Sequence, residues 1–140
     1  MSKIKNQLKS NYRFVKIQTI KRRSGLLGVV TDKNINFKIK RAYFLYQVPY
    51  LGKRGGHAHK TLKQVYICIQ GKFVILLNDG FFKKKIILNS RSKGLVLFKN
   101  TWRDIISYSK NSILLVLASD KYKKEDYIRS YKSFLKYIKK

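Results

Sequence analysis

Short apolar runs, separated by turn residues, cover most of the chain. Runs rich in β-branched and aromatic residues are typical of strands, and we predict strands at residues 12–20, 26–31, 37–48, 64–70, 73–77, 81–88, 95–98 and 112–118. Asp79 and Gly80 separate two of these runs, and an Asp-Gly pair suits a tight hairpin turn. The pattern predicts an all-β fold whose strands close into a barrel.

The hydrophobic period changes after Asp120. Apolar residues then recur at the spacing of one helix face, at Tyr127, Ile128, Tyr131, Phe134, Leu135 and Ile138. Glu125 and Asp126 suit the first turn, because carboxylates stabilise the positive end of a helix dipole. We therefore predict a C-terminal α-helix over about residues 121–140, an N-terminal extension over 1–11, and one domain spanning 1–140.

The composition favours a folded, non-membrane protein. Hydrophobic residues make up 44% of the 140-residue chain, too many for a disordered segment. No apolar run approaches the roughly 20 residues of a membrane helix, and the first residues do not resemble a secretory signal, so we expect a cytoplasmic protein without a membrane partner. The single cysteine, Cys68, lies in a strand-like run and is expected to pack in the core.

The net charge of +27 raises a rival hypothesis, a basic β-barrel that binds RNA. The lysines are scattered from Lys3 to Lys140 and form only short clusters, such as residues 83–85. Proteins that read nucleic acids favour arginine and interleaved aromatic residues on one face. We therefore expect no nucleic-acid partner.

His57 and His59 are the only histidines in the chain. In an extended strand their side chains point to the same face, although a chance pair at the surface would have the same spacing. Two histidines at this spacing also begin the metal site of many β-barrels, but no third histidine exists and Gln64 stands where a glutamate ligand would be. We expect no metal, and the remaining chemistry is acid–base catalysis near neutral pH.

Three segments, 40–44, 54–60 and 64–71, resemble in order and spacing the sugar nucleotide 3,4-ketoisomerases, which are WxcM-like cupins. The similarity continues through residues 77–80, Trp102, 117–120 and 125–131. The resemblance implies a cupin barrel, that is, a double-stranded β-helix or jelly roll. It also implies a homodimer with exchanged N-terminal strands that uses neither a metal nor an organic cofactor.

The resemblance further implies the reaction. The substrate would be dTDP-4-keto-6-deoxy-D-glucose, converted through an enediol to a dTDP-3-keto-6-deoxyhexose that an aminotransferase then uses for surface glycans such as the O-antigen of lipopolysaccharide. His57 and His59 match the catalytic pair, with His59 as the expected base at C3. The expected substrate-binding residues are Arg41, Tyr43, Arg54, Lys60, Trp102 and Arg103.

Arg103 departs from the family pattern, because many members have histidine after the tryptophan. An arginine stabilises negative charge but does not readily donate a proton. This departure leaves open the configuration at C4 of the product. It also leaves open a second alternative, a catalytically silent cupin that only binds nucleotide sugars.

Overall fold

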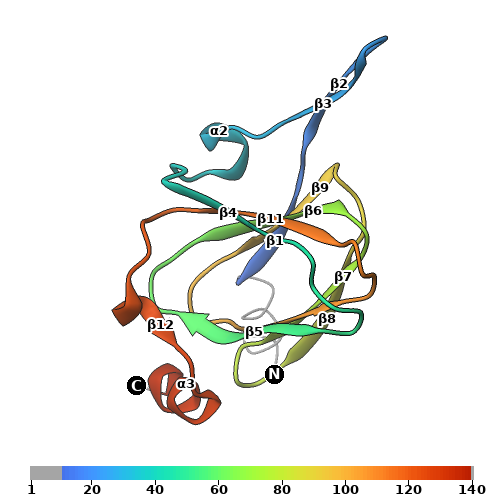
Figure 1. Cartoon of the computed structure of the whole chain (residues 1–140). Helices are drawn as coiled ribbons and strands as arrows, with labels where there is room; N and C mark the ends of the chain where they lie inside the picture. The colour runs from blue at the N-terminus through green and yellow to red at the C-terminus, as the bar shows by residue number, and fades with distance from the viewer. Residues whose placement is uncertain (1–10, 140) are drawn as a thin grey trace.

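The computed structural model describes residues 11–139 and consists mainly of two five-stranded antiparallel sheets that face each other (Figure 1). The first sheet has the order β1 (Tyr12–Lys16), β9 (Lys93–Leu97), β6 (Gln64–Gln70), β11 (Ile113–Ala118) and β4 (Arg41–Leu45). The second has the order β12 (Tyr127–Ile128), β5 (Lys53–His59), β10 (Trp102–Ser107), β7 (Phe73–Asn78) and β8 (Lys83–Leu88). The all-β prediction is confirmed. Residues 1–10, most of the predicted N-terminal extension, lie outside the described part.

Strand β6 shows how the two sheets enclose the core. Tyr66 and Cys68 belong to the main cluster between the sheets, which confirms the predicted core position of the cysteine. Val65 and Ile67 point to the other face, where they join a second cluster with Ile35 of the short helix α2 (Asp32–Ile35). Because both faces are covered, the strand is a continuous apolar run rather than an alternating one.

The predicted C-terminal helix is shorter than the periodicity suggested. Helix α3 spans Tyr131–Ile138 and is capped by the Ser130 side chain, which accepts a bond from the Ser133 amide. Residues Lys124–Asp126 form the 3-10 helix η1, and β12 pairs with the end of β5. The placement of Glu125 and Asp126 in the first helical turn is therefore wrong. Backbone pairing and bonds to the Asp126 carboxylate outweigh the helical preference of this segment.

Helix α3 covers the outer face of the second sheet (Figure 1). Phe134 is fully buried there against Ala58, Trp102 and Ile128. Trp102 and Ala58 therefore point outward, and their strand neighbours point inward because side chains alternate along a strand. The histidines of β5 therefore lie on its inward face.

The strands of the structure differ from the sequence-based prediction in several places. The run 12–20 is split, because buried Ile17 separates β1 from β2 (Gln18–Arg22), and β2 pairs with β3 (Gly25–Val29) in a hairpin that projects from the barrel (Figure 1). The run 37–48 contributes only β4. The predicted runs also lack β5, β10 and β12. In β10, Arg103 and Asp104 interrupt the apolar pattern.

Candidate active site

The two histidines lie side by side on the inner face of β5. Their ring centroids are 4.9 Å apart, with the rings nearly perpendicular. His59 is fully buried and His57 is partly buried. The extended geometry predicted from their spacing is confirmed, and the alternative of a chance pair at the surface is excluded.

A glycine bulge places Arg54 on the same face as the histidines. His57 is paired with Arg103, whereas the next pair is Gly55 with Asp104, so Gly56 is the extra residue. Gly55 and Gly56 have φ values of 89° and 70°, a region that glycine adopts without strain. Beyond the bulge Arg54 pairs with the core residue Ile105. Its side chain is exposed and lines a recess of about 270 Å³ beside residues 44–49.

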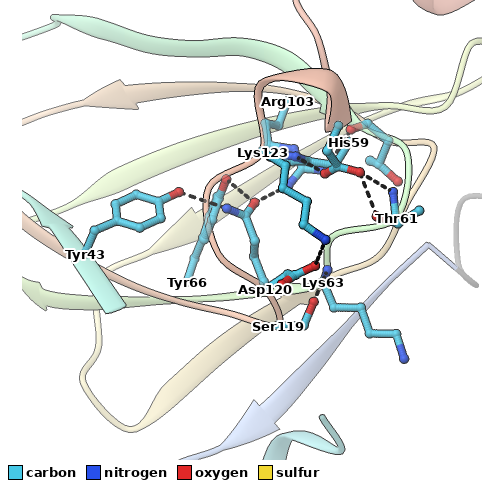
Figure 2. A network of polar contacts seen from close by, with 12 residues as sticks. Tyr43, His59, Thr61, Lys63, Tyr66, Arg103, Ser119, Asp120 and Lys123 are labelled. Carbon is cyan, nitrogen blue, oxygen red and sulfur yellow. Dashed lines mark hydrogen bonds and ion pairs between the residues drawn. The ribbon is translucent and has the colours of Figure 1, made fainter. Parts of the chain in front are cut away.

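His59 is held by a buried carboxylate. Its Nδ1 lies 2.9 Å from Oδ2 of Asp126, and the other oxygen of Asp126 accepts bonds from the amide and hydroxyl of Thr61 at 2.8 Å and 2.7 Å (Figure 2). Burial raises the pKa of Asp126, but the bonds from Thr61 and His59 outweigh it and lower the pKa overall. An ionised carboxylate only accepts bonds. The proton of His59 therefore sits on Nδ1, and Nε2 has a free lone pair.

His57 presents the same nitrogen. The backbone of Gly55 hydrogen-bonds the His57 ring, and Nε2 is buried without a partner among the described residues, as is Nε2 of His59. Burial, followed by the charge of Arg103, lowers the pKa of His57 to about 3 and also lowers that of His59. Both imidazoles are therefore neutral at pH 7 and act as proton acceptors.

Arg103, whose Cα is paired with that of His57 on the neighbouring strand, belongs to a hydrogen-bonded chain whose other members are neutral (Figure 2). Arg103 donates to Oε1 of Gln64 at 2.5 Å and to the Thr101 carbonyl at 2.9 Å. Tyr66 donates to the same Gln64 oxygen, and the Gln64 amide donates to the Tyr43 hydroxyl at 2.8 Å. Burial raises the pKa of Tyr43. Its hydroxyl therefore stays protonated and has a hydrogen to donate.

Aromatic rings and arginines border the histidines. The Tyr127 ring lies 4.4 Å from the His59 ring and 5.2 Å from the His57 ring, and it also contacts Tyr122. The Arg41 guanidinium lies 5.2 Å from the Tyr43 ring and 5.8 Å from the Tyr122 ring, and its Nε and Nη2 are buried without a hydrogen-bond partner among residues 11–139. This border combines donors for anionic oxygens with flat apolar surfaces.

The structure brings only some of the predicted site residues together. His57, His59, Tyr43, Arg41 and Arg103 converge, as described above. Trp102 and Lys60 do not. Trp102 precedes the inward residue Arg103 and Lys60 follows the inward residue His59, so both side chains point away from the histidines. Trp102 packs on Phe134 and Tyr131, and the Lys60 ammonium lies 5.8 Å from the Tyr137 ring of α3. Their expected substrate contact stays a prediction.

Sequence reasoning missed Asp126, Thr61, Gln64, Tyr66 and Tyr127. One signal was available for Gln64, which is a polar residue at the start of a strand that is otherwise apolar. Asp126 offered no such signal, because a carboxylate before an apolar helical pattern has an ordinary explanation as a dipole partner. Within residues 11–139 no group of three or more His, Cys, Asp or Glu side chains is placed to hold a metal ion.

Two facing antiparallel sheets with a neutral histidine pair on the inner face of one of them define a cupin-type protein. The family model described as FdtA: WxcM-like, C-terminal, matches residues 10–139. The chain belongs to this WxcM-like family, which confirms the resemblance found in the sequence.

Two of the similar proteins are named as isomerases. The chain is 40% identical over 118 residues to TDP-4-oxo-6-deoxy-α-D-glucose-3,4-oxoisomerase of Aneurinibacillus thermoaerophilus, covering 84% of this chain and 85% of the relative. A 3,4-ketoisomerase from Helicobacter canadensis superposes with a TM-score of 0.88 at 41% identity, covering 92% and 98% of the two chains.

A substrate complex is known for a third relative. A mutant of the 3,4-ketoisomerase from Thermoanaerobacterium thermosaccharolyticum, solved in complex with TDP-4-keto-6-deoxyglucose, superposes with a TM-score of 0.88 at 35% identity, covering 92% of this chain and 94% of that one. These comparisons support an enzyme, an isomerase, rather than a silent binding protein or an RNA-binding barrel. Among the described residues, no helix is long and apolar enough to span a membrane.

Proposed function

We propose that this chain converts dTDP-4-keto-6-deoxy-D-glucose to a dTDP-3-keto-6-deoxyhexose. The observation that carries the proposal is the state of His59, which is neutral and buried, with Nδ1–H bound to Asp126 and Nε2 free beside His57. Such a nitrogen removes a proton from carbon next to a ketone. The relatives named above supply the substrate class, since two of them are named for or solved with this keto sugar.

The reaction needs two proton transfers on carbon and no net oxidation. His59 Nε2 takes the proton from C3, the C–H electrons form a C3–C4 double bond, and the C4 carbonyl oxygen gains the negative charge. His57 then moves the C3 hydroxyl proton toward the C4 oxygen. The double-bond electrons then form a C4–H bond with a proton that replaces the one taken from C3. A lone pair of the C3 oxygen becomes the new C=O bond, so the ketone ends at C3.

Arg41, Tyr43 and Arg54 are proposed to bind the substrate. Guanidinium groups match the geometry of diphosphate oxygens, and Arg41 has buried donors without a partner among the described residues. The Tyr43 hydroxyl has a free hydrogen for a sugar oxygen. Trp102 and Lys60 are left out of this set, because both face away from the histidines.

Proton NMR in deuterated water tests the proposal directly. With the wild-type protein we expect deuterium at the exchanged carbon and the signals of a 3-keto sugar, which also give the C4 configuration. His59→Asn should lose both, because a positioned acid–base histidine contributes about 10²–10⁴-fold in rate. If the folded wild-type protein binds dTDP but gives neither exchange nor product, the isomerase is refuted. The result would then support the alternative of a catalytically silent cupin.

The homodimer is a second part of the proposal, and the β2–β3 hairpin supports it. The hairpin projects from the barrel (Figure 1). Leu26 and Leu27 in its strand β3 are 68% and 58% exposed. Exposed leucines on an isolated hairpin favour burial against a second copy. Light scattering after size-exclusion chromatography should give twice the chain mass. Leu26→Asp should lower it to one chain mass, while Phe81→Asp, at a similarly exposed residue elsewhere, should not. A monomeric wild-type protein would refute the dimer.

Location in the cytoplasm and a role in surface glycans such as the O-antigen stay predictions from the sequence and its family resemblance.

A further inference from the structure

Arg103 is a completely buried cation without a carboxylate partner. Its relative exposure is 0%, and it is the largest side chain among the described residues to be so enclosed. Its two hydrogen-bond acceptors, Gln64 and the Thr101 carbonyl, are both neutral. None of the ion pairs among residues 11–139 includes it. The positive charge is therefore not balanced by a contacting anion of the described part of the chain.

An unbalanced buried charge is unusual for a residue with a purely structural role. Transfer of a guanidinium from water to the interior is unfavourable, and proteins normally compensate with an anion. An apolar side chain of similar length would fill the same space without this penalty. A site that keeps such a charge is organised for an anion that is present only during function.

The position of Arg103 fits this role. Its Cα is paired with that of His57 across β5 and β10, so both side chains share the inner face. Arg103 Nε is buried without a partner in the described chain, so its N–H is available to donate. The Gln64 contact also joins Arg103 to the Tyr43 hydroxyl, which has its own hydrogen to donate. Two donors therefore converge where the histidines act.

We infer that Arg103 is a catalytic residue that stabilises the enediolate, the anion formed when the C3 proton leaves. This inference rests on the proposed function. When His59 takes the proton, negative charge appears on the C4 oxygen and, after the hydroxyl proton moves, on the C3 oxygen. The guanidinium donates to the charged oxygen and keeps its own proton throughout, so its charge is balanced only while the intermediate exists.

Arg103→Met tests the inference by two measurements, because kcat should fall while Tm should rise. Loss of an anion-stabilising donor should lower kcat about 10²–10³-fold. Removal of an unbalanced buried charge should raise Tm by about 3 °C or more, since Tyr66 still donates to the Gln64 oxygen. Arg91→Met, the same substitution at an exposed arginine, should change neither quantity.

A second readout separates catalysis from binding. The affinity of the Arg103→Met protein for dTDP, measured by calorimetry, should stay within about 3-fold of wild type, because the diphosphate carries its charge in every state. A lower Tm in this variant would show a structural arginine and overturn the inference, as would near-normal kcat. A wild-type protein without turnover would instead refute the proposed function, and the Tm result would still report whether the buried charge destabilises the fold.

Discussion

Asp126→Asn is the sharpest test of the geometry at His59. The two substituents of an asparagine amide differ, whereas the two oxygens of Asp126 are equivalent acceptors. One oxygen accepts both Thr61 bonds, at 2.7 Å and 2.8 Å, so the amide oxygen of the substituted side chain would keep this position. Its NH₂ group would then face His59 Nδ1 at the 2.9 Å contact. An NH₂ group only donates, so Nδ1 must accept and the ring proton moves to Nε2.

The expected magnitude follows from this exchange of tautomers. With a proton on Nε2, His59 has no lone pair for the C3 proton. The same substitution in the Ser-His-Asp triad lowers kcat about 10⁴-fold through the wrong tautomer, and we expect a fall of about 10²–10⁴-fold here. This corresponds to about 3–5 kcal/mol of transition-state stabilisation. The fold should survive, because both Thr61 bonds remain.

The assay combines turnover with a direct view of the ring. Isomerisation is followed by proton NMR at neutral pH, and the ¹⁵N chemical shifts of His59 report which nitrogen carries the proton. Asp120→Asn is the matched control, since Asp120 is a carboxylate that pairs with Lys123 at the surface. A folded Asp126→Asn protein with kcat within about 3-fold of wild type, or with the proton still on Nδ1, would refute the reasoning.

Two further predictions concern stability. Acidification should destabilise the protein, because burial lowers the pKa of His57 from 6.5 to about 3 and also lowers that of His59; between these values the unfolded chain binds protons that the folded chain does not. The urea midpoint should therefore be constant above about pH 7 and fall below about pH 6, with a smaller fall in His57→Asn, and a midpoint independent of acid would contradict the assigned neutrality. Gly55→Ala should destabilise by about 1–3 kcal/mol, since φ is 89° and the new Cβ would lie 3.0 Å from the Arg103 carbonyl oxygen. Gly28→Ala, where the nearest atom is 3.9 Å away, should be close to neutral in the same unfolding assay, and equal effects of the two would remove the strain argument.

The sequence predicted the parts of the fold that depend on local pattern. Most strands were found, because apolar runs and turn residues report burial along a short segment. The inward pair His57 and His59 was found for the same reason, since alternation along one strand is a local property. Strand β10 was missed because it carries two charged residues, Arg103 and Asp104. Arg103 points into the interior, and Asp104 pairs with Lys53. Backbone pairing with β5 and β7 makes this segment a strand despite its two charged residues.

The remaining site residues depend on contacts that no local pattern encodes. Asp126 reaches His59 across 67 positions of the chain, and its segment has the periodicity of a helix. Because Asp126 was placed in the predicted helix, the sequence analysis missed both the true start of the helix and the partner of His59. Trp102 and Lys60 were assigned from the resemblance alone, and only the sheet register shows that they face outward.

The segment that carries Asp126 contacts both faces of the second sheet. Within the described chain, the other nine strands of the two facing sheets and the main cluster between them lie before residue 119, whereas Asp126 follows them. A chain shortened before this segment would lose Ile128 and Phe134 from the buried cluster with Ala58 and Trp102, as well as the carboxylate that holds the His59 ring. One short segment thus contributes both to the outer packing of the sheet and to the orientation of an inner side chain.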